Sequence, residues 1–207
     1  MSTSIPERHP GRPSRAVYAD HDDATLVVYQ AYPAAIADAA LAAGTFVPPF
    51  RRERMTWIKP SYTWMMYRCG YATKPGQERV LAVRITAEGF TWALRHACPS
   101  HHDRALFPDR EQWRRRLQES PVRVQWDPER DLSGAPLEHR SVQVGLSGEA
   151  VRRYADEWIV GLTDVTPLAA RIRELRRAGE HTAAAALLPH ERPWPVPADA
   201  AARIGCP

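Results

Sequence analysis

Short stretches in which hydrophobic and polar residues alternate recur along the chain, and they predict β-strands. The stretch ATLVVYQAY (24–32) is also rich in β-branched and aromatic residues, as buried strands are. The same pattern favours strands in RVLAVRIT (79–86), PVRVQWD (121–127) and RSVQVGLS (140–147).

Between these stretches, apolar residues recur with helical spacing and are bounded by proline and glycine. Pro33 opens AAIADAALAAG, which ends at Gly44, and Pro60 opens PSYTWMMYRCG, which ends at Gly70. Proline is favoured at the first position of a helix, and glycine is favoured just after its end. Further helices are predicted in 87–98, 109–120 and 166–179. Residues 148–160 are expected to start as a helix that runs into a strand or turn near Trp158.

The order of these elements favours an α+β fold, a single domain with a small mixed or antiparallel sheet and packed helices. The connections do not form regular βαβ units, and no G-x-G-x-x-G or G-x-x-x-x-G-K-[ST] motif occurs. A Rossmann or P-loop nucleotide site is therefore not expected. We expect a disordered lead in residues 1–14, a globular domain in 15–190 and a Pro-rich extended tail in 191–207.

Composition narrows the class of protein. The chain has 207 residues, of which 44% are hydrophobic, and no apolar run approaches the ~20 residues of a membrane span. The N-terminus has no apolar segment of the kind found in secretory signals. Three scattered cysteines form no disulfide framework, which favours a cytoplasmic protein. The net charge of +4 permits a phosphate-bearing partner without requiring one.

Residues 55–70, MTWIKPSYTWMMYRCG, concentrate aromatic and basic side chains. On a helix that begins at Pro60, the positions with core spacing are Tyr62, Met65, Met66 and Cys69. Ser61, Trp64 and Arg68 form a neighbouring stripe, which is either a stacking wall for a base or nicotinamide or an ordinary half-buried boundary. Between residues 24 and 86 the chain has eight basic and three acidic residues, so an anionic ligand is favoured there.

Lys59 occupies the expected N-cap position of this helix. A lysine cannot accept hydrogen bonds from the free N–H groups of the first turn, so those groups and the ammonium would together favour an anion such as a phosphate. Ser61 would add a hydroxyl group. The alternative is that water or Thr56 satisfies the N–H groups and that Lys59 is solvated.

Two further clusters carry chemistry-bearing side chains. The first, HACPSHHD, contains metal-capable residues, His96, Cys98, His101 and His102. Their spacing matches no zinc-binding pattern, so we expect no metal site and a helix end with exposed histidines. In the second, QWDPERD, the acids Asp127, Glu129 and Asp131 suit a general acid or base, and an Asp-Pro turn explains them equally well.

Several motifs together resemble the family known as domain of unknown function 4291. They are VYQAY…AGTFVPPFRRERMTWIKPSYTWMMYR, KPGQERVLAVRIT, SPVRVQWDPERD and RSVQVGLSGEAVRRYADEWIVGLTDVTP. The resemblance covers roughly residues 14–195 and implies one domain. It brings no established activity with it.

The layout is also similar, more distantly, to ADP-ribosyltransferase folds. In those folds a first strand supplies a polar or His residue to the NAD ribose, and a following helix supplies aromatic residues around the nicotinamide. A later strand supplies a Glu or another polar residue that holds the ribose hydroxyls. The corresponding residues here are Gln30 or Tyr32, then Ser61, Tyr62 and Trp64, and finally Gln143. The usual His and Glu are both missing, and a Gln cannot place negative charge near an oxocarbenium-like transition state.

This likeness implies an ADP-ribosyltransferase-like enzyme that binds NAD or a related nucleotide and acts on a nucleic acid or another phosphorylated acceptor. Its expected roles are phosphate binding by Arg54, Lys59, Arg68 and the first helical turn, ring stacking by Trp57, Tyr62 or Trp64, and ribose orientation by Gln30, Tyr32 and Gln143. The alternative is a non-catalytic module that binds single-stranded nucleic acid with the same surface. A third possibility is an interaction protein in which the aromatic residues are simply core.

Overall fold

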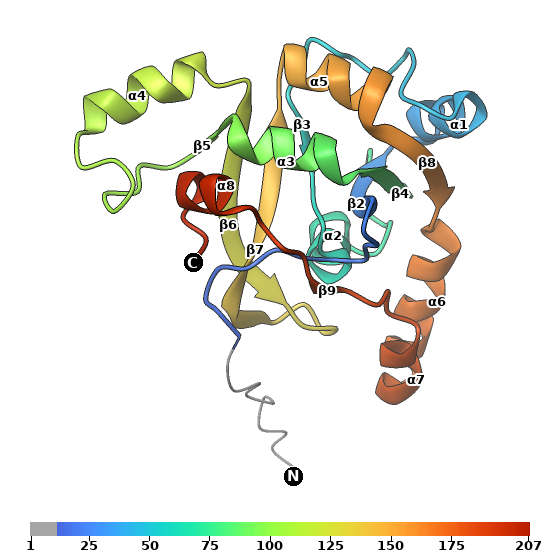
Figure 1. Ribbon diagram of the computed structural model, residues 1–207. Helices are drawn as coiled ribbons and strands as arrows, with labels where there is room; N and C mark the ends of the chain where they lie inside the picture. The colour runs from blue at the N-terminus through green and yellow to red at the C-terminus, as the bar shows by residue number, and fades with distance from the viewer. Residues whose placement is uncertain (1–11) are drawn as a thin grey trace.

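Two β-sheets form the centre of the protein (Figure 1). The structure, a computed structural model, describes residues 12–207. The smaller sheet has the order β2-β4-β8 and is antiparallel throughout. Its strands are β2 (Thr25–Tyr32), β4 (Arg79–Thr86) and β8 (Ile159–Asp164).

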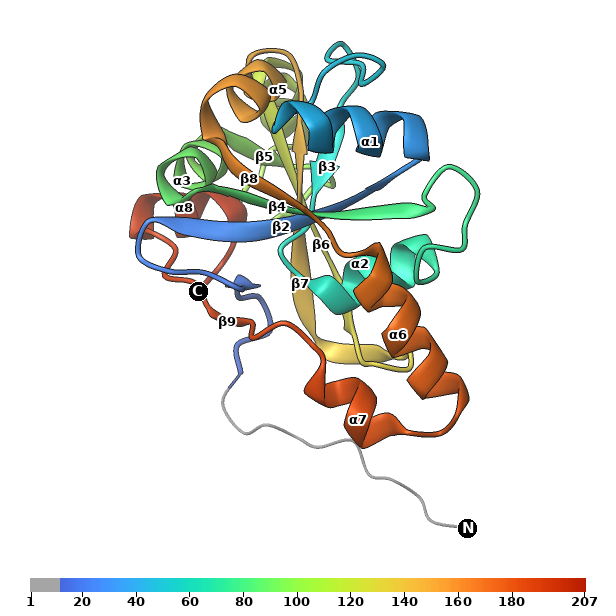
Figure 2. The same ribbon diagram turned by 90° about the vertical axis from the view of Figure 1, so that its right-hand side faces the viewer.

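The larger sheet has the order β3-β7-β6-β5 and runs across the first (Figure 2). Its strands are β3 (Thr56–Ile58), β7 (Pro136–Leu146), β6 (Val122–Arg130) and β5 (Ala97–Pro99). All its pairs are antiparallel except β5 with β6, which is parallel. A short ribbon pairs β1 (Tyr18–Ala19) with β9 (Arg192–Pro193).

The two sheets meet at one backbone contact, in which the N–H of Tyr29 donates to the carbonyl of Lys59 at 2.7 Å. Tyr29 lies in β2, and Lys59 follows β3 directly. The end of β3 therefore turns away from its own sheet and bonds to the other one. This contact places Lys59 between the two sheets.

Helices cover the sheets and complete two hydrophobic clusters. Leu26 and Val28 of β2 point into the larger cluster, whereas Val27 and Tyr29 point into the smaller one. Both faces of β2 are therefore buried, which explains its nearly continuous apolar sequence. The helices are α1 (Ala34–Ala43), α2 (Tyr62–Cys69), α3 (Ala87–Arg95), α4 (Arg110–Glu119), α5 (Glu149–Arg153), the π-helical turn Tyr154–Trp158, α6 (Thr166–Arg177), α7 (His181–Ala186) and α8 (Ala198–Ile204).

The predicted α+β class is confirmed, and the strands and helices lie close to the predicted positions. One prediction is wrong at its end, because the helix expected over 87–98 stops at Arg95. The next residues, Ala97–Pro99, form β5 and bond to β6. The helix that begins near residue 148 gives way to β8 at Ile159, as expected for a helix that runs into a strand or turn near Trp158.

The C-terminal residues 191–207 also differ from the expected extended tail. They contain β9 and α8, and Trp194 and Ile204 are buried in the larger hydrophobic cluster. Burial of these side chains compensates for the entropy lost on ordering a proline-rich segment. Of the disordered lead expected in residues 1–14, residues 1–11 lie outside the described residues.

Candidate functional site

A cavity of about 480 Å³ opens where β2, the loop before β3, and α2 come together. Its wall includes Gln30 and Tyr32 from the end of β2 and Trp57 from β3. The loop before β3 arrives there because α1 ends at Gly44, whose φ of 70° gives the left-handed conformation that stops a helix. The cavity thus combines residues from four separate segments of the chain, since Gly76 and Gln77 also line it.

The cavity gathers many of the side chains singled out in the sequence. They are Gln30, Tyr32, Arg54, Trp57, Lys59 and Arg68. Arg54 and Arg68 are exposed at its rim, together with Arg51. None of these three arginines forms an ion pair within the part of the chain that the structure describes. The rim is therefore basic and has no internal counter-charge.

Gln30 is buried and its amide group is fully engaged. Its Nε2 donates to Thr56 Oγ1 at 2.7 Å and to Tyr32 Oη at 2.8 Å, and its Oε1 accepts from Tyr154 Oη at 2.6 Å. Tyr32 Oη also lies 3.0 Å from Thr56 Oγ1. Gln30 therefore fixes the hydroxyl of Tyr32 in place, and Tyr32 is the member of this network that is only half-buried. Burial raises the pKa of Tyr32 well above its usual range, so this hydroxyl stays protonated.

Lys59 lines the same cavity although it is only 7% exposed. Within the described residues, its Nζ donates only to the carbonyl of Trp57, at 3.3 Å, and lies 5.4 Å from the centre of the Trp64 ring. Burial lowers the pKa of Lys59 to about 7, and the positive charge of Arg68 acts in the same direction. Lys59 is therefore a buried amine with one weak acceptor, beside an open cavity.

The start of α2 differs from the sequence-based prediction. The N-cap is Ser61, not Lys59, and its hydroxyl accepts from the N–H of Trp64 at 3.2 Å. The N–H of Tyr62 donates to the carboxylate of Glu191 at 2.6 Å. The Ser61 hydroxyl also donates to Glu129 at 3.0 Å. Two carboxylates of the protein thus occupy the place where a phosphate was expected, because the chain returns to this helix from both β6 and the C-terminal segment.

Ser61, Tyr62 and Trp64 therefore do not reach the cavity. Ser61 caps the helix, and Tyr62 is buried in the smaller hydrophobic cluster with its ring 5.3 Å from that of Tyr29. Trp64 is buried behind Lys59. Of the aromatic residues expected to stack on a ligand ring, Trp57 alone lines the cavity.

The remaining expected residue, Gln143, lies on β7, where its partner is Gln125 of β6. Its Nε2 donates to Asp127 at 2.6 Å, and Gln125 donates to the other oxygen of the same carboxylate at 2.8 Å. Asp127 is thus a half-buried carboxylate held from two sides. The alternative of an Asp-Pro turn is excluded, because Asp127 lies inside β6.

The family model described as domain of unknown function (DUF4291) matches residues 16–194. The chain belongs to this family. The match spans both sheets and every residue that lines the first cavity. Among curated proteins, comparison finds no match to this chain.

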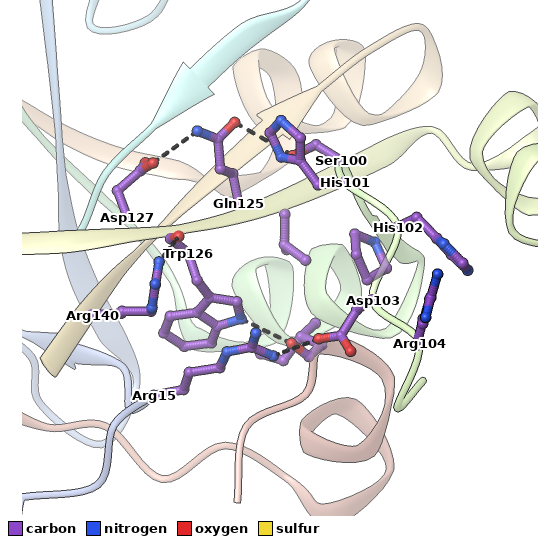
Figure 3. Close-up of a pocket in the computed structure, with 13 residues that line it drawn as sticks. Arg15, Ser100, His101, His102, Asp103, Arg104, Gln125, Trp126, Asp127 and Arg140 are labelled. Atoms are coloured by element: carbon purple, nitrogen blue, oxygen red, sulfur yellow. Dashed lines mark hydrogen bonds and ion pairs between the residues drawn. The ribbon is translucent and has the colours of Figure 1, made fainter. Parts of the chain in front are cut away.

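A second cavity of this DUF4291 protein, of about 470 Å³, lies beside β6 beyond the end of β5 (Figure 3). Arg15 and Asp103 form an ion pair of 2.9 Å on one side of β6, whereas Gln125 and Asp127 lie on the other side. Asp127 lines this cavity, and its charge also acts on Lys59, which lines the first cavity. Neither Asp127 nor Gln143 lines the first cavity.

The histidines of HACPSHHD lie near this second cavity and have partners of their own. His96 stacks on Trp92 with ring centres 3.9 Å apart, and His102 lies 2.8 Å from the carbonyl of Phe107. Within residues 12–207, no group of three or more His, Cys, Asp or Glu side chains is arranged to hold a metal ion. In the same range, no helix has the length and apolar character needed to cross a bilayer.

The residues that the sequence does not reveal are those that hold others in place. Tyr154 orients Gln30 from a π-helical turn, and Glu191 bonds to the start of α2 from the C-terminal segment. Their side chains give no periodic or motif signal, because their partners are 124 and 129 residues away. The WDPER stretch around Asp127 did carry a signal, namely clustered acids within a predicted strand end.

Proposed function

We propose that the first cavity binds an anionic nucleotide, NAD or a related molecule, and that the protein is an ADP-ribosyltransferase-like enzyme. The observation that carries this proposal is the buried amine of Lys59, which has no carboxylate partner among the described residues and lies inside a ring of arginines. Guanidinium and ammonium groups without internal counter-charges suit phosphate oxygens. A cavity of about 480 Å³ falls in the usual size range of ligand sites.

In this proposal Arg54, Arg68 and Lys59 hold the phosphates, and the indole of Trp57 stacks on a ring of the ligand. Tyr32 donates its fixed hydroxyl to a ribose oxygen. Gln30 acts indirectly, because its hydrogen bonds are used to hold Tyr32. Binding of a dianionic phosphate stabilises the charged form of Lys59, so nucleotide binding near neutral pH takes up a proton.

Asp127 supplies the negative charge that Gln143 cannot carry. Its carboxylate lies on the strand next to Gln143 and bonds directly to the Gln143 amide. A carboxylate there stabilises positive charge that develops on a ribose during transfer. Asp127 lines the second cavity, which we assign to the acceptor, a nucleic acid or another phosphorylated molecule.

A second candidate function is non-catalytic binding of single-stranded nucleic acid. The exposed arginines at the cavity rim and the half-buried Trp57 favour it, since such proteins combine a basic groove with stacking side chains. The two candidates differ in their response to salt. Strand binding weakens steeply as salt rises, with a slope set by the number of phosphates contacted, whereas a small nucleotide in a cavity depends on salt less.

The test is calorimetric titration of the purified protein with NAD, ADP-ribose, ATP and a short single-stranded oligonucleotide at pH 7. We expect saturable binding of NAD or ADP-ribose, weakened at least ~10-fold in Lys59→Met, because a charged hydrogen bond to phosphate is lost. Lys74→Met is the matched control, since Lys74 is the only other lysine, is exposed and does not line the cavity. Binding of the oligonucleotide alone would favour the second candidate, and equal nucleotide binding by both variants would refute the Lys59 site.

A further inference from the structure

The side-chain amine of Lys59 can act as a nucleophile, which phosphate binding does not require. Its side chain is a primary amine, it is 7% exposed, and it lines a cavity of about 480 Å³. No carboxylate among the described residues pairs with it. Its nearest polar contact is the carbonyl of Trp57 at 3.3 Å, which is long for a charged hydrogen bond. The site thus leaves this nitrogen free to act on a ligand.

The charged groups around Lys59 favour the uncharged amine. Arg68 lies near enough to lower its pKa, while Asp127 and Cys69 act weakly in the opposite direction. Burial is the largest effect and brings the pKa to about 7. At pH 7 about half of such amines carry a free electron pair, whereas an ordinary lysine does so in less than about 0.1% of molecules. Desolvated lysines of this kind are the ones that attack carbonyl carbons.

We infer that Lys59 forms an imine with the carbonyl carbon of a phosphate-bearing aldehyde or ketone bound in the first cavity. The Lys59 electron pair attacks the carbonyl carbon, the C–N bond forms, and the carbonyl oxygen takes up a proton. The resulting carbinolamine then loses water, whose hydrogens balance the two that leave nitrogen, and a C=N bond remains. No oxidant or reductant is required.

The ligand class follows from what surrounds the amine. Arg51, Arg54 and Arg68 stand at the rim and suit a phosphate, while Trp57 and Tyr32 suit a flat or sugar-like body. A phosphorylated sugar in its open-chain form has both groups, and so does a nucleotide that ends in a free reducing ribose. The inference goes beyond nucleotide binding, because it requires a carbonyl group and does not require a base.

The experiment uses pyridoxal 5′-phosphate, an aldehyde with a phosphate and an aromatic ring. The intact protein is incubated with the reagent at several pH values, the imine is reduced with borohydride, and the modified peptides are quantified by mass spectrometry. Only Lys59 and Lys74 are lysines, so the two sites are read separately. We expect Lys59 to react at least ~10-fold faster than Lys74 at pH 7, with its rate rising to a plateau around a midpoint of about 7.

Three controls test whether the fast reaction depends on Lys59 and on phosphate binding. Pyridoxal without the phosphate should lose most of the preference for Lys59, and so should Arg54→Gln, a rim substitution that leaves the buried network untouched. Lys59→Arg should abolish the fast adduct and keep the slow one at Lys74. The inference is overturned if Lys59 reacts no faster than Lys74 in the wild-type protein. A fast Lys59 adduct in a protein that binds no NAD, ADP-ribose or ATP would refute the proposed function and leave this inference standing.

Discussion

At the scale of single residues, the position of Lys59 is set by two strands rather than by its helix. Its backbone carbonyl bonds to Tyr29 of β2, which fixes the direction in which its side chain leaves the sheet. The side chain then lies between the Trp64 ring and the cavity. A lysine in this setting loses hydration without gaining a carboxylate, so its charged form is disfavoured in the folded protein.

The stability of the protein should therefore depend on pH through the ionisation of Lys59. The pKa of Lys59 is about 7 in the folded protein and near 10.5 in an unfolded chain, so between these values the unfolded state binds more protons. The Lys59 contribution to stability is therefore present above about pH 10.5 and is lost as the pH falls through about 7. We expect Lys59→Met to raise the free energy of unfolding by a few kcal/mol at pH 6 and by little near pH 10.

Denaturant unfolding of both proteins at pH 6, 8 and 10 measures this difference. Lys74→Met, at an exposed position, should change stability equally at all three pH values. If Lys59→Met raised the free energy of unfolding equally at pH 6 and pH 10, the pKa of Lys59 would not be lowered by burial.

At the scale of elements, the contact between α3 and the π-helical turn is unusually close. A Cβ atom built on Gly89 of α3 would lie 2.3 Å from Cγ of Trp158. Trp158 is 4% exposed and belongs to the larger hydrophobic cluster. The indole ring therefore packs directly on the helix backbone, and this is why a glycine stands in the first turn of a helix despite its low helix propensity. The turn that carries Trp158 also carries Tyr154, whose hydroxyl orients Gln30.

Gly89→Ala should accordingly destabilise the protein, although alanine is the better helix former. We expect a loss of about 1–3 kcal/mol, since the indole of Trp158 or the helix must shift to admit the methyl group. The thermal midpoint in differential scanning calorimetry measures it. Gly179→Ala serves as a comparison, because its destabilisation would come from backbone strain and not from a steric clash. That glycine has a φ of +78° and open space around it. A Gly89→Ala variant as stable as the wild type would show that α3 and the turn are not in close contact.

At the scale of the whole molecule, the C-terminal segment returns to the start of α2 and closes the fold. Glu191 accepts a hydrogen bond from the N–H of Tyr62 at 2.6 Å, and the preceding residue, Ser61, donates to Glu129 of β6. Burial raises the pKa of Glu191 to about 8, and the negative charges of Glu129 and Asp20 act in the same direction. Arg12 and the Tyr62 N–H oppose this rise. The segment is thus held by a carboxyl group that favours its protonated form near neutral pH.

Stability should fall as this group ionises. Because the folded pKa of about 8 lies above the ordinary value of 4.5, the folded state binds more protons between these values. The Glu191 contribution is therefore complete below about pH 4.5 and is lost as the pH rises through about 8. Glu191→Gln keeps an oxygen for the Tyr62 N–H and removes the ionisation, so it should stabilise the protein at pH 8 by a few kcal/mol and change little at pH 5.

The thermal midpoints of the wild type and of Glu191→Gln, measured at pH 5 and pH 8, test this prediction. Glu180→Gln is a suitable control, since Glu180 is an exposed glutamate near α7. A wild-type midpoint that falls by the same amount as that of Glu191→Gln between the two pH values would place the source of the pH dependence elsewhere.

The sequence by itself determined most local elements and several of the residues that line the first cavity. Pro33 with Gly44 and Pro60 with Gly70 mark α1 and α2 closely, because helix starts and stops depend on backbone angles that proline and glycine control. The alternation in 121–127 and 140–147 identified β6 and β7. The concentration of basic and aromatic residues around residues 55–70 predicted an anion site, and Trp57, Lys59 and Arg68 from this stretch line the first cavity.

Tertiary structure alone decided which side chains meet. The pairing of Asp127 with Gln143, of Gln30 with Tyr154 and of Tyr62 with Glu191 joins residues that no periodic pattern connects. The same packing makes Ser61, not Lys59, the N-cap of α2. It also places the side chains of Glu129 and Glu191 at the first turn of this helix and buries the amine of Lys59. Burial and charge at a site are sums over neighbours from the whole chain, whereas sequence patterns report only neighbours within a few residues.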